Sequence, residues 1–222
     1  MIRFDHVTKR YPERGEALSD LSFDLESGEM AFLTGRSGAG KSTLLRLIGL
    51  MERPTRGSVS VNGRDLAGIP RRQIPYYRRE LGIIFQDHHL LPDRSVFDNV
   101  ALPLVVTSMS RGEIGRRVRA ALDQVGLLGK ERCLPAALSG GEQQRVGIAR
   151  AVVGRPSVII ADEPTGNLDP DLAREVMQLF RRFHQVGVTL LIATHDLGLI
   201  TAMPFRTLTL HEGRLAVDSG IW

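Results

Sequence analysis

Residues 35–42 have the sequence Gly35-Arg36-Ser37-Gly38-Ala39-Gly40-Lys41-Ser42. This stretch fits the phosphate-binding pattern G-x-x-x-x-G-K-[ST]. The apolar run 30–34 before it is typical of a buried parallel strand, and residues 43–48 after it are typical of a helix. In such a strand–loop–helix unit, glycines let the backbone N–H groups wrap around an anion at the helix N-terminus. The sequence therefore predicts a nucleotide site and disfavours a glycine-rich turn that binds nothing.

The side chains of this loop have separate expected roles. Lys41 is expected to reach the β- and γ-phosphates, and the Ser42 hydroxyl is expected to bind Mg²⁺. Arg36 fills a free position of the pattern, and no role is inferred for it. The expected nucleotide contacts are Gly35, Ser37, Gly38, Ala39, Gly40, Lys41, Ser42 and Thr43.

Composition bounds the class of protein. The chain has 222 residues, of which 42% are hydrophobic and 24% charged, as in ordinary globular domains. Its net charge of +4 suits ATP, an anionic membrane surface or nucleic acid equally well. The single cysteine, Cys133, excludes an internal disulfide and favours a reducing cytosol. We expect no signal peptide and no membrane-spanning helix, so membrane work would need another chain.

Buried strands alternate with amphipathic helices along the chain, which predicts an α/β fold with a parallel sheet. Strands are expected at 2–7, 21–25, 30–34, 57–61, 81–85, 158–161 and 188–193. Helices are expected at 43–48, 95–104, 110–125 and 140–153, and after Asp169-Pro170. The arginine-rich stretch between 63 and 81 is interpreted as a solvated surface.

Several helix starts carry capping signals. Ser95 and Asp169 are expected N-caps, the latter followed by a proline at the first helical position. The segments Ser110–Glu113 and Ser139–Glu142 each fit a capping box. After Asp169, apolar residues at spacings of four, three and four predict one buried helix face, formed by Leu172, Val176, Leu179 and Phe183.

Polar residues follow three of the expected core strands, where α/β proteins keep their ligands. Asp162 suits a Mg²⁺-holding carboxylate, and Glu163 beside it suits a general base toward water. Gln86 could bind Mg²⁺ or water, and His195 could hydrogen-bond the γ-phosphate. Each of these residues alone is more often structural, but together with the phosphate loop they predict one catalytic site.

Two further features, Tyr11 and the pair His88-His89, have less specific sequence signals. Tyr11 fits a core residue and a base-stacking residue equally well. The pair His88-His89 does not predict a metal site, because adjacent side chains diverge and no further ligands stand at suitable spacing.

One further run narrows the class: Leu138-Ser139-Gly140-Gly141-Glu142-Gln143-Gln144-Arg145. Locally it is a capped helix start whose two glycines expose backbone N–H groups, and it therefore predicts a second anion site. In its order between Gln86 and Asp162, the run resembles the signature of the ATP-binding cassette (ABC) ATPases. The resemblance covers essentially the whole chain.

The resemblance implies the fold of an ABC ATPase nucleotide-binding domain. That fold has a phosphate-loop core with a mixed, mainly parallel sheet, an antiparallel β subdomain and an inserted helical subdomain. We expect a single domain over 1–222, with core and β subdomain at about 1–86 and 154–222 and the helical subdomain at 87–153.

It also implies an ATP-dependent, head-to-tail homodimer with Mg²⁺ as cofactor. Ser139, Gly140 and Gly141 of one subunit would close over the phosphates held by the other, and Asn167-Leu168-Asp169 would cross the dimer. Within one chain, Tyr11 would stack on adenine, Asp162 would bind Mg²⁺ through water, and Glu163 would be the catalytic base. Gln86 would couple hydrolysis to a membrane partner, and His195 would be the switch histidine.

Residues 85–91 and 93–100 are similar to the cell-division branch of this family. That likeness implies an integral membrane partner without a transport pathway, indirect contact with other division proteins, and a place on the cytoplasmic face of the inner membrane at the septum. The apolar residues Leu90 and Leu91 are the expected contacts with this partner, ahead of Val96, Phe97 and Val100.

Three alternatives remain. The nearest is an ATPase of the lipoprotein-releasing or macrolide-efflux type, in which only the partner differs. A cassette acting on DNA or ribosomes would need long coiled-coil insertions or a second cassette, so no nucleic acid is expected. A scaffold that binds ATP without turnover is disfavoured by the presence of Glu163 and His195.

Overall fold

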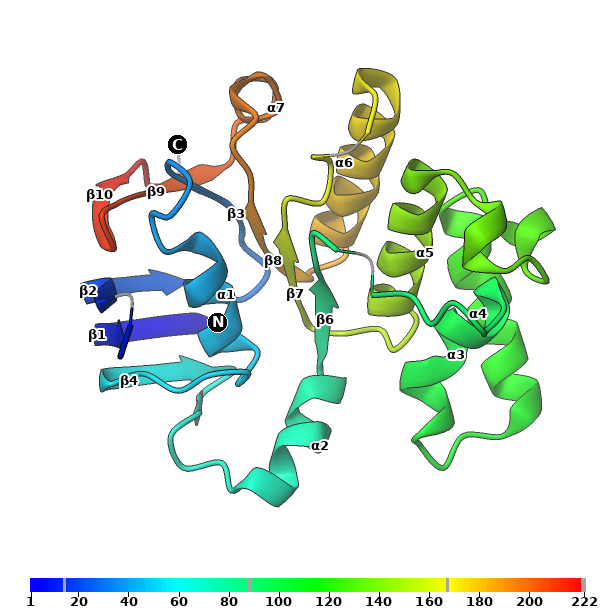
Figure 1. The fold of residues 1–222 in the computed structure, drawn as a ribbon, viewed down its shortest axis with the longest axis horizontal. Helices are drawn as coiled ribbons and strands as arrows, with labels where there is room; N and C mark the ends of the chain where they lie inside the picture. Colours follow the sequence, from blue (N-terminus) through cyan, green and yellow to red (C-terminus); the bar gives the residue numbers. More distant parts are fainter. Residues whose placement is uncertain (14, 88, 167, 221–222) are drawn as a thin grey trace.

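The computed structural model describes residues 1–13, 15–87, 89–166 and 168–220 (Figure 1). Its strands are β1 (Ile2–Tyr11), β2 (Gly15–Leu25), β3 (Met30–Thr34), β4 (Arg56–Val61), β5 (Arg64–Asp65), β6 (Leu81–Ile84), β7 (Val158–Asp162), β8 (Thr189–Ala193), β9 (Arg206–His211) and β10 (Arg214–Asp218). Its helices are α1 (Lys41–Ile48), α2 (Ile74–Arg79), α3 (Val96–Val105), α4 (Arg111–Gln124), α5 (Gly140–Val152), α6 (Pro170–Gln185) and α7 (Leu197–Ala202). Single 3-10 turns cover Arg71–Gln73, Leu128–Lys130 and Pro135–Ala137.

The larger sheet has the order β10-β9-β3-β8-β7-β6, and all its neighbours are parallel except β10, which runs antiparallel to β9. Its central strands are buried on both faces, which explains their near-continuous apolar sequences. Side chains alternate between two cores with the strand period of two. Met30 and Phe32 enter one core, and Ala31 and Leu33 enter the other.

The smaller sheet is antiparallel, in the order β2-β1-β4-β5. Its apolar face and helix α1 belong to the same core as one face of the larger sheet. Phe4 of β1 and Phe23 of β2 stack there with ring centroids 4.8 Å apart. Helix α1, which begins at the phosphate loop, is thereby held between the two sheets.

The opposite face of the larger sheet packs on α5 and α6, and α3 and α4 extend that core outward. Figure 1 shows these helices on the side of the molecule away from the smaller sheet. Asn99 of α3 is fully buried, and its side chain hydrogen-bonds the backbone of Leu91 and Arg94 in the preceding loop. No helix among the residues described is long and apolar enough to cross a membrane.

The α/β class, the parallel core and the antiparallel second sheet are confirmed, but some elements escaped the sequence pattern. Strands β9 and β10 were missed, because β10 is a mostly exposed edge strand without clean alternation. Helix α2 was missed within the arginine-rich stretch, since it is only six residues long. Short helix α7 was missed as well.

The capping predictions have mixed outcomes. Ser95, Ser139 and Asp169 are N-caps, and the Ser139–Glu142 capping box is complete. The Ser110 box is only half formed, because the Glu113 carboxylate pairs with Arg116 and Arg117 instead. On α6, Val176 and Leu179 are buried as predicted, whereas Leu172 and Phe183 are only partly buried.

Candidate nucleotide-binding site

The carboxyl ends of β3, β6, β7 and β8 meet at one edge of the larger sheet, beside a cavity of about 630 Å³. This edge is where α/β proteins bind ligands. The cavity is lined by Tyr11, Glu16, Ala17, Gly35, Arg36, Ser37, Gly38, Ala39, Gly40, Lys41, Ser42, Thr43, Gln86, Asp162, Glu163 and His195. The structure thus gathers the whole predicted phosphate loop, Tyr11 and the four strand-end residues around one space.

The conformation of the phosphate loop depends on glycine at two positions. Gly35 and Gly40 have φ angles of 140° and 106°, which disfavour any side chain. A Cβ atom on Gly35 would lie 2.4 Å from the Leu210 carbonyl oxygen, and one on Gly40 would lie 2.6 Å from the Ala17 carbonyl oxygen. The loop is therefore packed tightly against β9 and β2, and only glycine fits at these two positions.

Lys41 begins α1, and its ammonium group stays within the loop. Its Nζ donates to the carbonyl oxygen of Gly35 at 2.7 Å and, more weakly, to that of Arg36 at 3.4 Å. These bonds hold the cation at the rim of the cavity. A bound phosphate would compete with the two carbonyl oxygens for the same protons.

Ser42, Gln86 and Asp162 present a hydroxyl, an amide and a carboxylate to the cavity. Burial raises the pKa of Asp162, and the nearby Glu163 charge raises it further, while a hydrogen bond from Ser42 opposes the shift. Oxygen donors of these types are the ligands that Mg²⁺ prefers. The residues present therefore fit a magnesium ion.

Glu163 follows β7, and His195 follows β8. Glu163 adopts a left-handed backbone, with φ 48°, and its backbone N–H donates to the Ala193 carbonyl oxygen at 2.9 Å. The Glu163 side chain is only 12% exposed, whereas the His195 side chain is 74% exposed. Oε1 of Glu163 lies 2.8 Å from Nδ1 of His195. A shielded carboxylate thus accepts a hydrogen bond from a histidine that reaches into solvent.

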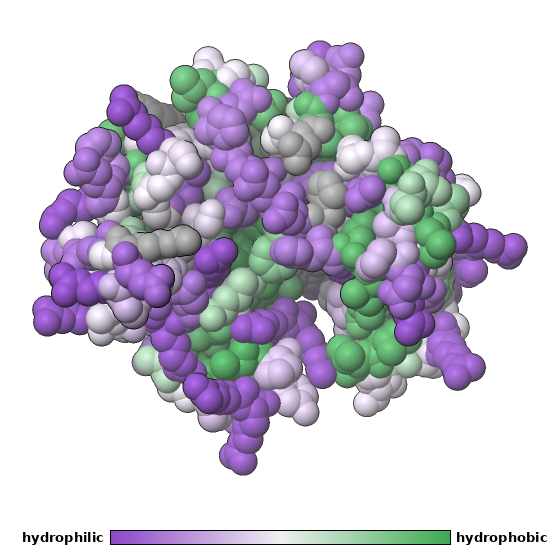
Figure 2. Space-filling model, viewed as in Figure 1, coloured by the Kyte–Doolittle hydropathy of each residue, from purple (hydrophilic) through white to green (hydrophobic). Residues whose placement is uncertain are grey.

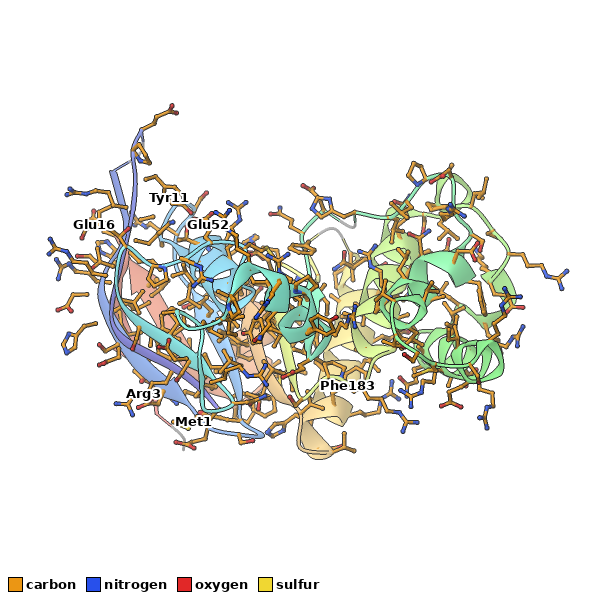
Figure 3. The ribbon with its side chains drawn as sticks, turned by 90° about the horizontal axis from the view of Figure 1, so that it is seen from below. Met1, Arg3, Tyr11, Glu16, Glu52 and Phe183 are labelled. Carbon is orange, nitrogen blue, oxygen red and sulfur yellow. The ribbon has the colours of Figure 1, made fainter. Side chains whose placement is uncertain are left out.

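Tyr11 lies at the end of β1, on the same side of the cavity as β2. Its hydroxyl is 3.4 Å from the Thr43 hydroxyl, and the Lys9 ammonium lies 5.0 Å from its ring centroid. Figure 3 shows Tyr11, Glu16 and Glu52 at the same end of the smaller sheet. The half-buried ring lines the cavity, so a core-only role is wrong for this residue.

Sequence reasoning missed Glu16 and Ala17 as lining residues. They belong to β2, which begins at Gly15, whereas the alternation in the sequence marked only its second half. No motif distinguishes these two positions, and only the pairing of β2 with β1 brings them to the cavity.

The signature residues do not line this cavity. Ser139, Gly140 and Gly141 lie at the start of α5, where the capping box uses bonds of 3.0 Å and 3.3 Å between Ser139 and Glu142. Lys130 pairs with the Glu142 carboxylate and, with the Ser139 N–H, holds its pKa below the usual value. Gly140 faces open space, whereas a Cβ on Gly141 would lie 2.7 Å from Leu172.

Asp169 also lies outside the cavity lining, and its carboxylate caps α6 by accepting from the N–H groups of Asp171 and Leu172. Asn167, predicted to lie beside it in the dimer loop, falls outside the described residues, as does His88. Among the residues described, no cluster of three or more His, Cys, Asp or Glu side chains could hold a metal ion by itself.

The chain is similar to known proteins along almost its whole length. Residues 18–166 match the ABC transporter family. The chain is 56% identical to the cell division ATP-binding protein FtsE of Escherichia coli K12 over 97% of both chains, and 44% identical to FtsE of Bacillus subtilis over 98% of this chain and 96% of the relative. The structure superposes with a TM-score of 0.93 on the dimeric ATP-binding cassette MJ0796 bound to ADP and phosphate, which is 32% identical, over 100% and 99% of the two chains.

The chain belongs to the ABC transporter family of ATP-binding cassettes, and within that family to the group of the cell division ATP-binding proteins FtsE. It is an ATP-binding ABC ATPase with the ABC cassette fold.

Proposed function

We propose that this chain is the ATP-hydrolysing subunit of a cell-division complex, and that it signals through an FtsX-like integral membrane protein to septal cell-wall hydrolysis. The observation that carries the proposal is the 56% identity to E. coli FtsE over nearly the full length of both chains, joined to a cavity that gathers the residues hydrolysis needs. The chain would then sit on the cytoplasmic face of the inner membrane, held there by its partner.

In the proposed reaction, Glu163 takes a proton from the attacking water. Its side chain lines the cavity, is only 12% exposed and is the carboxylate there that contacts His195. His195 orients that carboxylate through the 2.8 Å contact. Ser42, Gln86 and Asp162, the last through water, would hold Mg²⁺, which neutralises phosphate charge when bound. Lys41 releases its loop carbonyls to bind the phosphates.

We further propose that the complete site forms between two copies of the chain. The support is the separation of Ser139, Gly140 and Gly141 from the cavity, together with the dimeric state of the similar cassette MJ0796. Gly140 faces open space and is therefore accessible to a second subunit, and helix α5 offers its N–H groups there. Residues 87–153 would form the helical subdomain that presents this face to the partner copy.

Mixing two inactive variants tests this composite site. Lys41→Ala removes the phosphate cation, and Gly140→Asp places a negative charge at the signature helix. Each variant alone should be inactive, but a mixture contains heterodimers with one intact composite site, so part of the activity should return. Activity per chain should also rise with protein concentration. A mixture without recovery, together with a concentration-independent wild-type rate, would contradict the shared site.

The membrane partner is proposed to dock beside the loop that follows Gln86. Of the candidate apolar contacts, Val96 and Val100 are fully buried in the core, and Phe97 and Leu90 pack against it. Leu91 is 40% exposed and stands at a fixed place, since Asn99 bonds both its N–H and its carbonyl. Leu91 is therefore the stronger candidate, and burying it at an interface is worth about 1.5–3 kcal/mol.

Co-purification from membranes tests the partner. Leu91→Glu should reduce recovery of FtsX at least tenfold, while ATP hydrolysis by the isolated chain stays largely intact. Leu128→Glu is the matched control, because Leu128 has similar exposure, 41%, but lies elsewhere in the helical part. Mass spectrometry of the wild-type complex identifies the partner. A lipoprotein-releasing or macrolide-efflux permease in place of FtsX would contradict the division function.

A further inference from the structure

The segment from Ile69 to Arg79 is strongly basic. It contains Arg71, Arg72, Arg78 and Arg79 and no acidic residue. The whole chain has 29 Lys and Arg against 25 Asp and Glu, so the four arginines of this segment equal the entire net charge of +4. Residues 69–79 therefore form a short stretch with a local net charge of +4.

Side-chain hydrogen bonds hold this segment against the end of helix α1. The buried Tyr77 hydroxyl donates to the Ile48 carbonyl at 2.6 Å, and Arg78 donates to the carbonyls of Gly49 and Leu50. Arg53 donates to the carbonyl groups of Leu66 and Ala67, just before the segment, and of Ile69, its first residue. One of the four arginines is therefore used for anchoring, at the C-terminus of α1, where a cation is favourable.

The outer side is formed by Arg71, Arg72, Tyr76 and Arg79, which we name the arginine patch. All four side chains are exposed, and Tyr76 is 62% exposed. Tyr76 and Arg79 lie three residues apart on α2 and so share a face, where the Arg79 guanidinium lies 4.7 Å from the Tyr76 ring centroid. Arg71 and Arg72 lie in the 3-10 turn that leads directly into this helix. Among the described residues, neither Arg71 nor Arg72 has an ion pair.

The patch lies far from the nucleotide cavity in the fold. Helix α2 precedes β6 and so stands at the amino end of that strand, whereas Gln86 and the cavity follow its carboxyl end. Figure 1 shows α2 protruding at an outer edge of the molecule, and Figure 2 shows hydrophilic side chains over it. A protruding edge can touch a flat surface without moving the catalytic residues.

We propose that the arginine patch docks on anionic lipid headgroups. Clustered arginines bind the phosphates of an anionic membrane surface, and tyrosine prefers the headgroup level, where its ring is half buried and its hydroxyl stays wet. Single-stranded nucleic acid is the weaker match, because it is bound by a groove with successive stacking aromatics, and this element offers one exposed ring already covered by Arg79. Lipid contact here would orient the chain at the membrane independently of any protein partner.

Vesicle co-sedimentation of the isolated full chain tests the proposal. Vesicles of phosphatidylcholine with about 30% phosphatidylglycerol, at about 0.1 M salt, should bind the wild type, and pure phosphatidylcholine should not. The paired change Arg71→Ala with Arg72→Ala should lower the partition coefficient about 25-fold, at about fivefold per arginine. The charge-matched control is Arg181→Ala with Arg182→Ala, on the exposed side of α6, which should retain most of the binding.

The two substitutions should leave the fold intact, since the side chains of Arg71 and Arg72 make no hydrogen bond or ion pair within the described residues. Unchanged ATP hydrolysis and an unchanged thermal midpoint will verify this. If the two double variants lose vesicle binding equally, the binding depends on net charge alone and the proposal is wrong. Tight, patch-dependent binding of single-stranded RNA with no vesicle binding would also overturn it. The vesicle assay contains no FtsX, so a negative result there would not contradict the proposed division function. Likewise, failure to co-purify FtsX would not contradict the proposed lipid contact.

Discussion

Asn99 is expected to hold the loop that carries the candidate partner contact, and its removal should cost a measurable part of the stability. Its side chain is 0% exposed. Oδ1 accepts from the Leu91 N–H at 2.8 Å, and Nδ2 lies 3.0–3.1 Å from the carbonyl oxygens of Leu91, Arg94 and Ser95. Without the Asn99 side chain, the Ser95 carbonyl would still accept from the Asn99 backbone N–H, and the Leu91 carbonyl would still accept from the Arg94 backbone N–H. Truncation therefore strips the Leu91 N–H and the Arg94 carbonyl of their partners.

At about 1 kcal/mol for each hydrogen bond lost, with more for a group left buried, Asn99→Ala should lower the free energy of unfolding by about 2–4 kcal/mol. Asn99→Leu separates the loss of hydrogen bonds from the loss of packing, because leucine fills the volume of asparagine but makes none of its hydrogen bonds. Urea unfolding gives the stability, and proteolysis of the native chain reports opening of residues 89–95. If Asn99→Leu matches the wild type in both measurements, the bonds of Asn99 contribute nothing and the reasoning is wrong.

Two further predictions concern other elements. The Asp20 carboxylate hydrogen-bonds His6 at 2.7 Å and raises its pKa, so Asp20→Asn should lower the pKa of His6 toward the ordinary value in an NMR titration. The wild-type pair should add stability below the unfolded-state pKa of histidine, and this gain should disappear as pH rises through the folded-state pKa of His6. An unchanged His6 titration in Asp20→Asn would show that Asp20 does not raise this pKa. Tyr77→Phe removes the buried bond to the Ile48 carbonyl and should cost about 1–2 kcal/mol in urea unfolding, and a loss below about 0.3 kcal/mol would argue against the anchoring of α2.

The parts of the fold with strong periodicity followed from the sequence. Strands such as β3 and β8 are buried on both faces, so apolar runs predicted them, and the N-caps at Ser95, Ser139 and Asp169 predicted helix starts. Edge strand β10 and the six-residue helix α2 lacked a periodic signal, because their positions depend on contacts with distant segments.

The candidate site was predictable to the extent that motifs place residues at strand ends. Parallel strands brought Asp162, Glu163 and His195 to the phosphate loop, since their carboxyl ends share one edge. The lining by Glu16 was not predictable, because it depends on the register of β2 with β1. Likewise, no local pattern indicates that the Lys41 ammonium would bind the loop's own carbonyls.

The central claim, that Glu163 is the base of an ATP-hydrolysing site, is tested most directly by comparing turnover with ATP binding in Glu163→Gln. Glutamine keeps the size and can still accept the hydrogen bond from His195, so ATP binding and folding should be retained. Loss of the base should lower kcat by about 10²–10⁴-fold, whereas Lys41→Ala should weaken ATP binding itself. Turnover in Glu163→Gln within about threefold of the wild type, at equal ATP affinity, would contradict the assignment.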